Sequence, residues 1–403
     1  MECDKRLTNL IADILKKEFK LSGAQILRTA PDNPKEDNYR PKSKKAHVLG
    51  QFQEGQEVRE DIGEITFTDV AGREAIYYIA HPYVHSEGMQ VETIIKQMRS
   101  FARLLKDYNA GVEQLSLVLP VTPYDLNHSV KRREREGLLE VDHLRMFLED
   151  LARDNYNEII TICSHSDKTR EIAQDLGMFF RDINPFRSES GVPSPRLGPF
   201  LYKNPENTEK RVDYDSQIAK VTPFITWIKN NYKDNMDEIY FVAPDDGSER
   251  LLEKIAYACR GDKQHILSIL KERLGPGNVK ILGVKSSSTA QLEDIQGRTC
   301  VFADDKRLSG NTLNEIAYSL KNDHNAGPVV ALIAHDQSYD DGILKHTCID
   351  KFVFLETNPR SYAAQLEDDR IERMSMETTA RLLSTEIFDS YVKLRDLGEQ
   401  KVR

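Results

Sequence analysis

The segment CVFADDKRLSGNTL, residues 300–313, brings two carboxylates, two hydroxyl groups and a glycine within a few positions of one another. Carboxylates such as those of Asp304 and Asp305 accept hydrogen bonds from sugar hydroxyls or bind a hydrated magnesium ion. Backbone N–H groups at the start of a helix bind a phosphate, and a glycine permits its close approach. We therefore expect this loop to bind a ribose diol at its strand end and a phosphate at its helix end, where the residues are Ser309, Gly310, Asn311 and Thr312.

Strand-like and helix-like segments alternate before and after this loop, which is the order that gives a parallel sheet with helices on its faces. Runs rich in β-branched and aromatic residues predict strands at 64–70, 75–80, 114–121, 158–163, 238–243, 279–284, 299–303, 328–334 and 351–356. Apolar residues at helical spacing predict helices at 91–108, 139–154, 167–177, 216–232, 249–259, 265–274 and 312–321. A first amphipathic helix has one apolar face, formed by Leu7, Leu10, Ile11 and Ile14. Ligands bind beyond the carboxyl ends of parallel strands, so the loops that follow these strands are candidate binding sites.

The chain length of 403 residues favours two domains. The alternation stops in the proline-rich segment 184–211, which we interpret as a linker or a long loop. We expect an N-terminal domain of residues 1–205 and a C-terminal domain of residues 206–403, each an open, mainly parallel α/β sheet flanked by helices. The last helix is free to pack back on the N-terminal domain.

Composition limits the classes of partner. The formal net charge of -9 predicts no general attraction to nucleic acid or to an anionic membrane, so neither is an expected partner. We interpret the short basic run KRRER, residues 131–135, as the solvent-exposed start of a helix. It can still contact a phosphate. Five scattered cysteines without a C-x-x-C pair indicate a reducing compartment. With no signal peptide and no membrane-spanning stretch, the expected localisation is cytoplasmic.

The order of four apolar residues, two acids, three further residues and Ser-Gly-Asn-Thr resembles the phosphoribosyl-binding loop of type I phosphoribosyltransferases and of ribose-phosphate pyrophosphokinases, also called phosphoribosyl pyrophosphate synthetases. The alternative is a surface loop that has an Asp-Asp turn and binds no ligand. Two tandem α/β blocks favour the pyrophosphokinases, and the resemblance implies two phosphoribosyltransferase-like domains. It runs from about Asp61 to the final helix through DIGEITFTDVAGREAIYYIAHP, LSLVLPVTPY, IITICSHSD, VAPDDGSERL, VVALIAHDQSYDDG and FLETNPRS.

This resemblance implies roles for individual residues. His165 and Asp245 would hold a divalent metal, Mg²⁺, on the nucleotide phosphates, and His165 and Lys285 would be the catalytic pair, with Lys285 neutralising charge on the transferred group. The pyrophosphate loop would comprise Asp246, Gly247, Ser248 and Arg250. The nucleotide-binding residues would be Glu64, Asn127, His128 and Arg135. The family also implies a homodimer or a larger homo-oligomer.

Departures from the family pattern lie on the nucleotide side. Ser287 stands where the family usually has an arginine, Ile62 stands where an aspartate precedes Gly-Glu, and residues 125–128 replace an Arg-Gln-Asp run. The sequence therefore supports the expected acceptor, a ribose phosphate, better than the expected donor, a nucleotide.

The expected reaction moves the β,γ-pyrophosphoryl group of ATP to the 1-hydroxyl of ribose 5-phosphate, which gives phosphoribosyl pyrophosphate and AMP. Two alternatives stay open. One is a catalytically silent regulatory homologue that binds ribose phosphates or nucleotides. The other is the same chemistry on a larger acceptor such as ADP-ribose.

Overall fold

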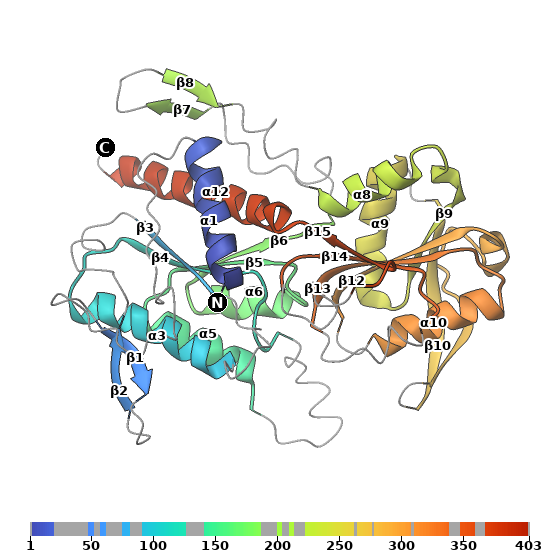
Figure 1. The fold of residues 1–403 in the computed structure, drawn as a ribbon, viewed down its shortest axis with the longest axis horizontal. Helices are drawn as coiled ribbons and strands as arrows, with labels where there is room; N and C mark the ends of the chain where they lie inside the picture. The colour runs from blue at the N-terminus through green and yellow to red at the C-terminus, as the bar shows by residue number, and fades with distance from the viewer. Residues whose placement is uncertain are drawn as a thin grey trace. The chain divides into compact units, whose positions relative to one another are not determined.

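A computed structural model describes most of the chain (Figure 1): residues 2–19, 47–51, 57–61, 75–80, 91–125, 141–186, 200–203, 209–212, 222–261, 264–275, 278–307, 310–337, 347–358 and 367–401. The chain divides into two compact units. The first unit comprises Met1–Ile183 and Thr379–Arg403, and the second comprises Asn184–Thr378. The last helix, α12 (Met376–Lys401), therefore lies almost entirely in the first unit.

The first unit is built on a four-stranded sheet in which all neighbours are parallel. Its apolar strands are buried on both faces, as is usual when helices cover a parallel sheet; residues Leu117, Val118, Leu119, Ile159 and Ile160 have no exposed surface. Its strands, in spatial order, are β3 (Ala75–Ile79), β4 (Gln114–Leu119), β5 (Glu158–Ile162) and β6 (Phe179–Ile183). A separate antiparallel pair is formed by β1 (His47–Gln51) and β2 (Glu57–Asp61).

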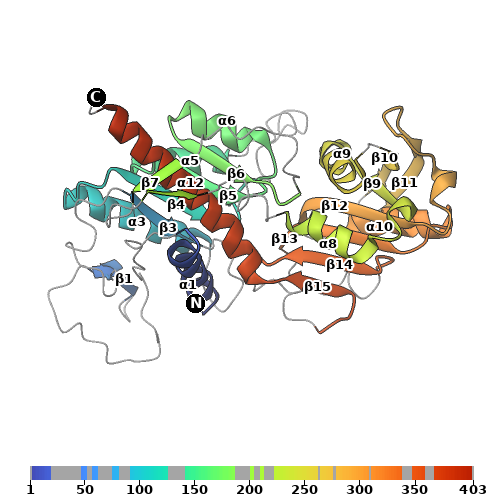
Figure 2. The same ribbon diagram turned by 90° about the horizontal axis from the view of Figure 1, so that it is seen from above.

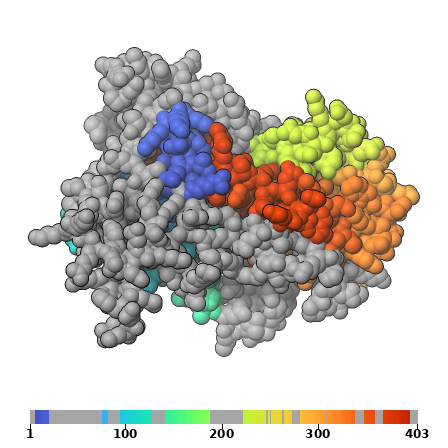
Figure 3. Space-filling model, viewed as in Figure 1, coloured from blue at the N-terminus to red at the C-terminus, as the bar shows by residue number. Residues whose placement is uncertain are grey.

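Helices cover both faces of this sheet (Figure 1). One face packs against α3 (Val91–Asp107), α5 (His143–Arg153) and α6 (Asp167–Asp175), through a core that includes Met98, Leu148 and Ile172. The other face carries α12, and α1 (Glu2–Lys17) lies against α12, as Figure 3 shows for the surface of the two helices. The rings of Phe19 and Phe388 stack with their centroids 4.5 Å apart, which fixes this helix pair.

A buried polar network joins α12 to the amino ends of the strands. Glu158 accepts hydrogen bonds from the Ser116 hydroxyl at 2.8 Å and the Ser390 hydroxyl at 2.5 Å, and it pairs with Arg181. Arg181 also donates to Asp389 at 2.6 Å. Because these groups satisfy one another at the edge of the sheet opposite the strand-end loops, we assign them to structure and not to ligand binding.

The second unit is built on a seven-stranded sheet. All neighbouring strands are parallel except the pair β10 and β11. The helices α8 (Pro223–Tyr232) and α9 (Asp246–Arg260) lie on one side of it and α10 (Asn311–Asn322) on the other (Figure 2). Short 3₁₀ turns cover Met236–Glu238 and Leu292–Ile295. The strands, in spatial order, are β11 (Asn278–Val284), β10 (Ile266–Gly275), β9 (Ile239–Ala243), β12 (Thr299–Arg307), β13 (Val329–Asp336), β14 (Lys351–Leu355) and β15 (Ile371–Met374).

The predicted fold class is confirmed: mainly parallel sheets flanked by helices occur in both units. The first helix is also confirmed, with Leu7, Ile11 and Ile14 buried. The strand expected at 64–70 and the start of the helix expected at 216–232 lie outside the described residues.

Two local predictions are wrong. The helix expected at 265–274 is strand β10, because the short apolar run ILSIL fits either element and its pairing with β9 and β11 decides between them. The strand expected to stop at residue 303 continues to Arg307, since β12 stays paired with β13 up to Arg307 and Asp336. The segment 184–211, interpreted as a linker or a long loop, begins where the two units divide, and its described residues include strands of a short antiparallel pair, β7 (Phe200–Lys203) and β8 (Glu209–Val212).

Candidate functional site

The predicted ribose-phosphate loop, residues 304–312, begins at the carboxyl end of β12, the strand between β9 and β13. Asp304 and Asp305 are half-buried near this end, where Asp304 lies opposite Ile333 of β13. Gly310 has φ +67° and is the N-cap of α10, a left-handed conformation that suits glycine. Because glycine has no side chain to cap the helix, the first backbone N–H groups of α10 are suited to bind an anion. Asn311 and Thr312 form its first turn, and Ser309 lies outside the described residues.

Three carboxylates influence one another at this edge of the sheet. The pKa of Asp304 is raised well above its usual range, first by burial, then by the negative charge of Asp305 and a hydrogen bond with it, and also by Asp245. Asp245 follows β9, the direct neighbour of β12. The fold therefore places acids from two loops close enough to repel, a surplus of negative charge that sugar hydroxyl donors or a cation would offset.

Asp245 is the N-cap of α9. Its Oδ1 accepts hydrogen bonds from the Ser248 N–H and the Ser248 hydroxyl, both at 3.0 Å, so Ser248 is buried in a capping box. Asp246, Gly247 and Arg250 belong to the first turns of α9, whose backbone N–H groups are the donors expected for the pyrophosphate.

Lys285 comes directly after β11 and lies beside the same turn. Its Nζ is 3.3 Å from Glu249 Oε2, and its backbone N–H donates to the Ser268 carbonyl at 2.8 Å. β10 and β11 make this contact possible, because β11 runs back antiparallel to β10 and brings residue 285 next to the end of β9. The lysine and the pyrophosphate loop predicted from separate motifs are thus together in the structure.

Glu249 is a site residue that the sequence reasoning missed. Its pKa is lowered, first by a hydrogen bond from the Ser287 hydroxyl and then, against the opposing effect of burial, by Lys285. Ser287, which stands where the family has an arginine, therefore binds a carboxylate. The signal was the position of Glu249 within PDDGSER, next to Ser248.

A buried ion pair behind the loop was also missed. Arg307 has a fully buried side chain that pairs with Asp336, and its guanidinium carbon lies 5.2 Å and 5.0 Å from the ring centroids of Phe352 and Phe354. The sequence reasoning placed Arg307 in the loop after a strand that was expected to end at residue 303, so nothing indicated a buried partner.

His165 is in the first unit, in the exposed turn after β5. Its backbone N–H donates to Oδ2 of the buried Asp125 at 3.2 Å, and the neighbouring Ser164 N–H donates to Asp182 at 2.9 Å. The structure thus describes His165 in one unit and Asp245, Lys285 and the ribose-phosphate loop in the other. The predicted nucleotide-binding residues Glu64, Asn127, His128 and Arg135 lie outside the described residues.

Two searches of the described part of the chain gave negative results. No group of three or more His, Cys, Asp or Glu side chains there is arranged to hold a metal ion. None of the helices described is both long enough and apolar enough to cross a membrane.

Comparisons with known proteins give a consistent relationship. No protein-family model matches the chain. The ribose-phosphate pyrophosphokinases of two Neisseria meningitidis strains, of serogroups A and B, are each 29% identical to it over 164 residues. The crystal structure of phosphoribosylpyrophosphate synthetase from Mycobacterium smegmatis aligns with 86% of this chain and 91% of that chain, with a TM-score of 0.59 and 15% identity. The chain is thus similar in sequence to ribose-phosphate pyrophosphokinases over part of its length, and it is similar in fold to a phosphoribosylpyrophosphate synthetase.

The sequence match covers 39% of the chain and 46% of each Neisseria relative, so the chain spans less than half the length of those relatives. The resemblance inferred from the motifs is confirmed at the level of this relationship and of the fold. The expected homo-oligomer, the magnesium ion and the individual residue roles stay predictions.

Proposed function

We propose that the protein transfers the β,γ-pyrophosphoryl group of ATP to the 1-hydroxyl of ribose 5-phosphate. One observation carries this proposal: Asp304 and Asp305 lie near the carboxyl end of a central strand, and the left-handed Gly310 opens a helix a few residues later. This arrangement offers acceptors for a diol and donors for a phosphate on one loop. The relationship to ribose-phosphate pyrophosphokinases supports the same assignment.

The acceptor would lie along the ribose-phosphate loop. The carboxylates of Asp304 and Asp305 accept hydrogen bonds from the 2- and 3-hydroxyls, and the N–H groups at the start of α10 bind the 5-phosphate. Holding the sugar at both ends leaves the 1-hydroxyl as the group to be positioned for attack, and much of the rate enhancement of phosphoryl transfer comes from such positioning.

The donor phosphates would lie between the start of α9 and Lys285. The ribose 1-oxygen attacks the β-phosphorus, the bond from this phosphorus to the α-phosphate oxygen breaks, and AMP leaves with that oxygen. Without substrate, Lys285 pairs with Glu249. In the reaction it exchanges this partner for the phosphoryl oxygens and offsets the charge that develops on them.

A magnesium ion bound mainly by water and substrate fits the residues present. Mg²⁺ usually takes one or two carboxylates and completes its coordination with water and phosphate oxygens, so it does not need a cluster of three protein ligands. Asp245 would hold the ion together with the donor phosphates, and the ion would supply neutralisation of the phosphate charge. His165 is the further ligand that the resemblance implies.

A direct assay tests the proposal. The protein is incubated with ATP, ribose 5-phosphate and Mg²⁺, and AMP and phosphoribosyl pyrophosphate are quantified by chromatography. Equal amounts of both products are expected with wild type, and none with Asp304→Asn. If neither ribose 5-phosphate nor ADP-ribose yields a nucleoside monophosphate from ATP or other triphosphates, the transferase assignment is wrong.

One observation favours a second candidate, a ligand-binding homologue without turnover. Both Lys285 and Ser287 contact Glu249. The lysine that is expected to neutralise the phosphates therefore already pairs with a carboxylate. Calorimetry separates the candidates: this homologue binds ribose 5-phosphate at the same loop, but no AMP forms in the assay.

A further inference from the structure

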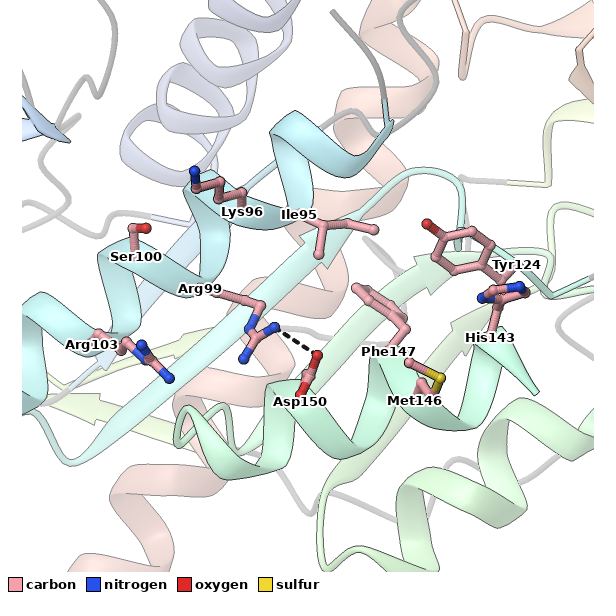
Figure 4. A pocket seen from close by; sticks show the side chains of 10 residues that line it. All are labelled: Ile95, Lys96, Arg99, Ser100, Arg103, Tyr124, His143, Met146, Phe147 and Asp150. Carbon is pink, nitrogen blue, oxygen red and sulfur yellow. Dashed lines mark hydrogen bonds and ion pairs between the residues drawn. The ribbon is translucent and has the colours of Figure 1, made fainter. Parts of the chain in front are cut away.

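A pocket in the first unit is lined by none of the residues assigned to the proposed reaction. It has a volume of ≈ 370 Å³ and lies between α3 and α5, with Tyr124 contributed by the turn after β4. This volume is near the lower end of the range of pockets that hold small ligands, about 300–1,000 Å³. It suits one ring system with one small substituent. Figure 4 shows its lining side chains.

One end of the pocket is aromatic and apolar. The rings of Tyr124 and His143 have centroids 5.6 Å apart and are tilted by 32°, and Phe147 meets Tyr124 edge-on at 6.2 Å. Met146, half of whose surface is exposed, lies beside them (Figure 4). Aromatic faces and a polarisable thioether together form a surface that accepts a planar ring.

The other end is cationic. Arg99 donates to Asp150 at 2.6 Å and to Asp154 at 2.7 Å, Arg153 also reaches Asp150, and Arg103 reaches Asp154. Among the described side chains that line the pocket, three are cationic, those of Lys96, Arg99 and Arg103, and one is anionic, that of Asp150. The Arg103 side chain is 63% exposed and reaches solvent at the pocket rim.

Tyr124 stands in a strained conformation. Its φ of +61° is in the left-handed region, which costs a residue with a side chain about 1–2 kcal/mol. A bulky residue persists there only when its surroundings fix it, and such outliers gather at ligand sites. Asp125, the next residue, is buried and holds the turn through the His165 N–H. This conformation points the Tyr124 ring into the pocket (Figure 4).

We propose that this pocket binds a small aromatic phosphate, with its ring at Tyr124, His143 and Met146 and its phosphate at Arg103 and Lys96. The ring and the anion match the two ends of the pocket, and their separation along α3 and α5 sets the orientation. None of the lining residues is among those assigned to the proposed transfer reaction, so binding at this pocket is measured apart from that reaction.

The test measures binding of 1-naphthyl phosphate to the full chain by calorimetry. This probe has a ring and a phosphate but lacks the ribose diol that the other loop recognises. Wild type is expected to bind it. Arg103→Glu is expected to weaken binding about tenfold or more, the effect of losing a hydrogen bond to a charged group. Met146→Glu, an exposed change on α5, is expected to weaken it similarly. AMP is the second probe.

Two matched controls keep the result interpretable. Arg170→Glu makes the same charge change on α6, outside the pocket, and Asp304→Asn alters only the ribose-phosphate loop; both are expected to bind 1-naphthyl phosphate as wild type does. The proposal is overturned if wild type does not bind the probe, if Arg170→Glu weakens binding as much as Arg103→Glu, or if AMP binding depends on Asp304 and not on Arg103. Binding that survives both pocket variants also overturns it.

Discussion

Arg307 and Asp336 form a buried ion pair directly behind the ribose-phosphate loop. Arg307 Nε and Nη2 lie 3.0 Å and 2.9 Å from Asp336 Oδ1, and the two residues are paired across β12 and β13. This pair explains why β12 continues past the two aspartates. It gives Asp304 and Asp305 a rigid strand instead of a loose loop.

The first prediction concerns this pair. Arg307→Met is expected to lower the free energy of unfolding of the second unit by about 3–5 kcal/mol, because it leaves Asp336 buried without its partner. The double variant Arg307→Met/Asp336→Leu is expected to recover much of that loss. Urea unfolding followed by the fluorescence of Trp227, the single tryptophan and a buried residue of this unit, measures it. A single variant as stable as wild type would contradict the structural role.

The second prediction separates backbone strain from ligand binding. Gly310→Ala and Gly297→Ala both place a side chain at a φ near +70° (+67° and +69°), so each is expected to cost about 1–2 kcal/mol of stability. Only Gly310 lies at the proposed phosphate site. Gly310→Ala is therefore expected to raise the dissociation constant for ribose 5-phosphate several-fold, while Gly297→Ala leaves it unchanged. If the two substitutions change the dissociation constant equally, Gly310 does not contribute to the phosphate site.

The third prediction uses the raised pKa of Asp304. Above the ordinary aspartate pKa, near 4, the unfolded chain loses this proton while the folded chain keeps it, so stability falls as pH rises until the folded-state pKa is passed. Below that range both states are protonated and the penalty is absent. Asn cannot ionise, so in metal-free buffer Asp304→Asn is expected to be more stable than wild type at neutral pH and equal to it in acid.

The same substitution replaces a carboxyl oxygen, which accepts a hydrogen bond from the ribose diol, with an amide NH₂ group that can only donate, and it is expected to weaken ribose 5-phosphate binding roughly 10- to 100-fold. Trp227 fluorescence across a pH series gives the stability, and calorimetry gives the affinity. A variant that is less stable than wild type at every pH, and that binds normally, would refute both the repulsion among the three acids and their role.

The fourth prediction concerns Lys285. If it offsets charge on the transferred group, Lys285→Ala is expected to lower kcat about 10²- to 10³-fold with a smaller change in KM for ribose 5-phosphate. Lys321→Ala is the matched control, since this lysine pairs with Asp350 at the opposite edge of the sheet. Because the pKa of Glu249 is lowered, its ion pair with Lys285 persists as the solution becomes mildly acidic and is lost only as pH falls through that lowered pKa.

Sequence reasoning predicted the fold class and the start of a helix after the Asp-Asp strand, because both depend on local patterns. Apolar runs such as VVALIA predict a buried strand, and Ser-Gly-Asn-Thr predicts a helix start. It placed Lys285 and the turn at Asp245 at strand ends, and the antiparallel return of β11 brings them together.

The missed features depend on tertiary partners. The run ILSIL in β10 fits a helix as well as a strand until its neighbours are known. Arg307 and Asp336 look like exposed residues at the ends of strands, since charged side chains there are normally solvated. Glu249 had no motif of its own, and its importance follows only from the contacts with Lys285 and Ser287.

The central claim is that residues 304–312 bind a phosphorylated pentose at both of its ends. Calorimetric titration of wild type and Asp304→Asn with ribose 5-phosphate, ribose and inorganic phosphate tests it most directly. We predict tight binding of ribose 5-phosphate by wild type, much weaker binding of ribose or phosphate alone, and a loss of affinity for ribose 5-phosphate in Asp304→Asn. Absence of ribose 5-phosphate binding, or equal affinity in the two proteins, would contradict the claim.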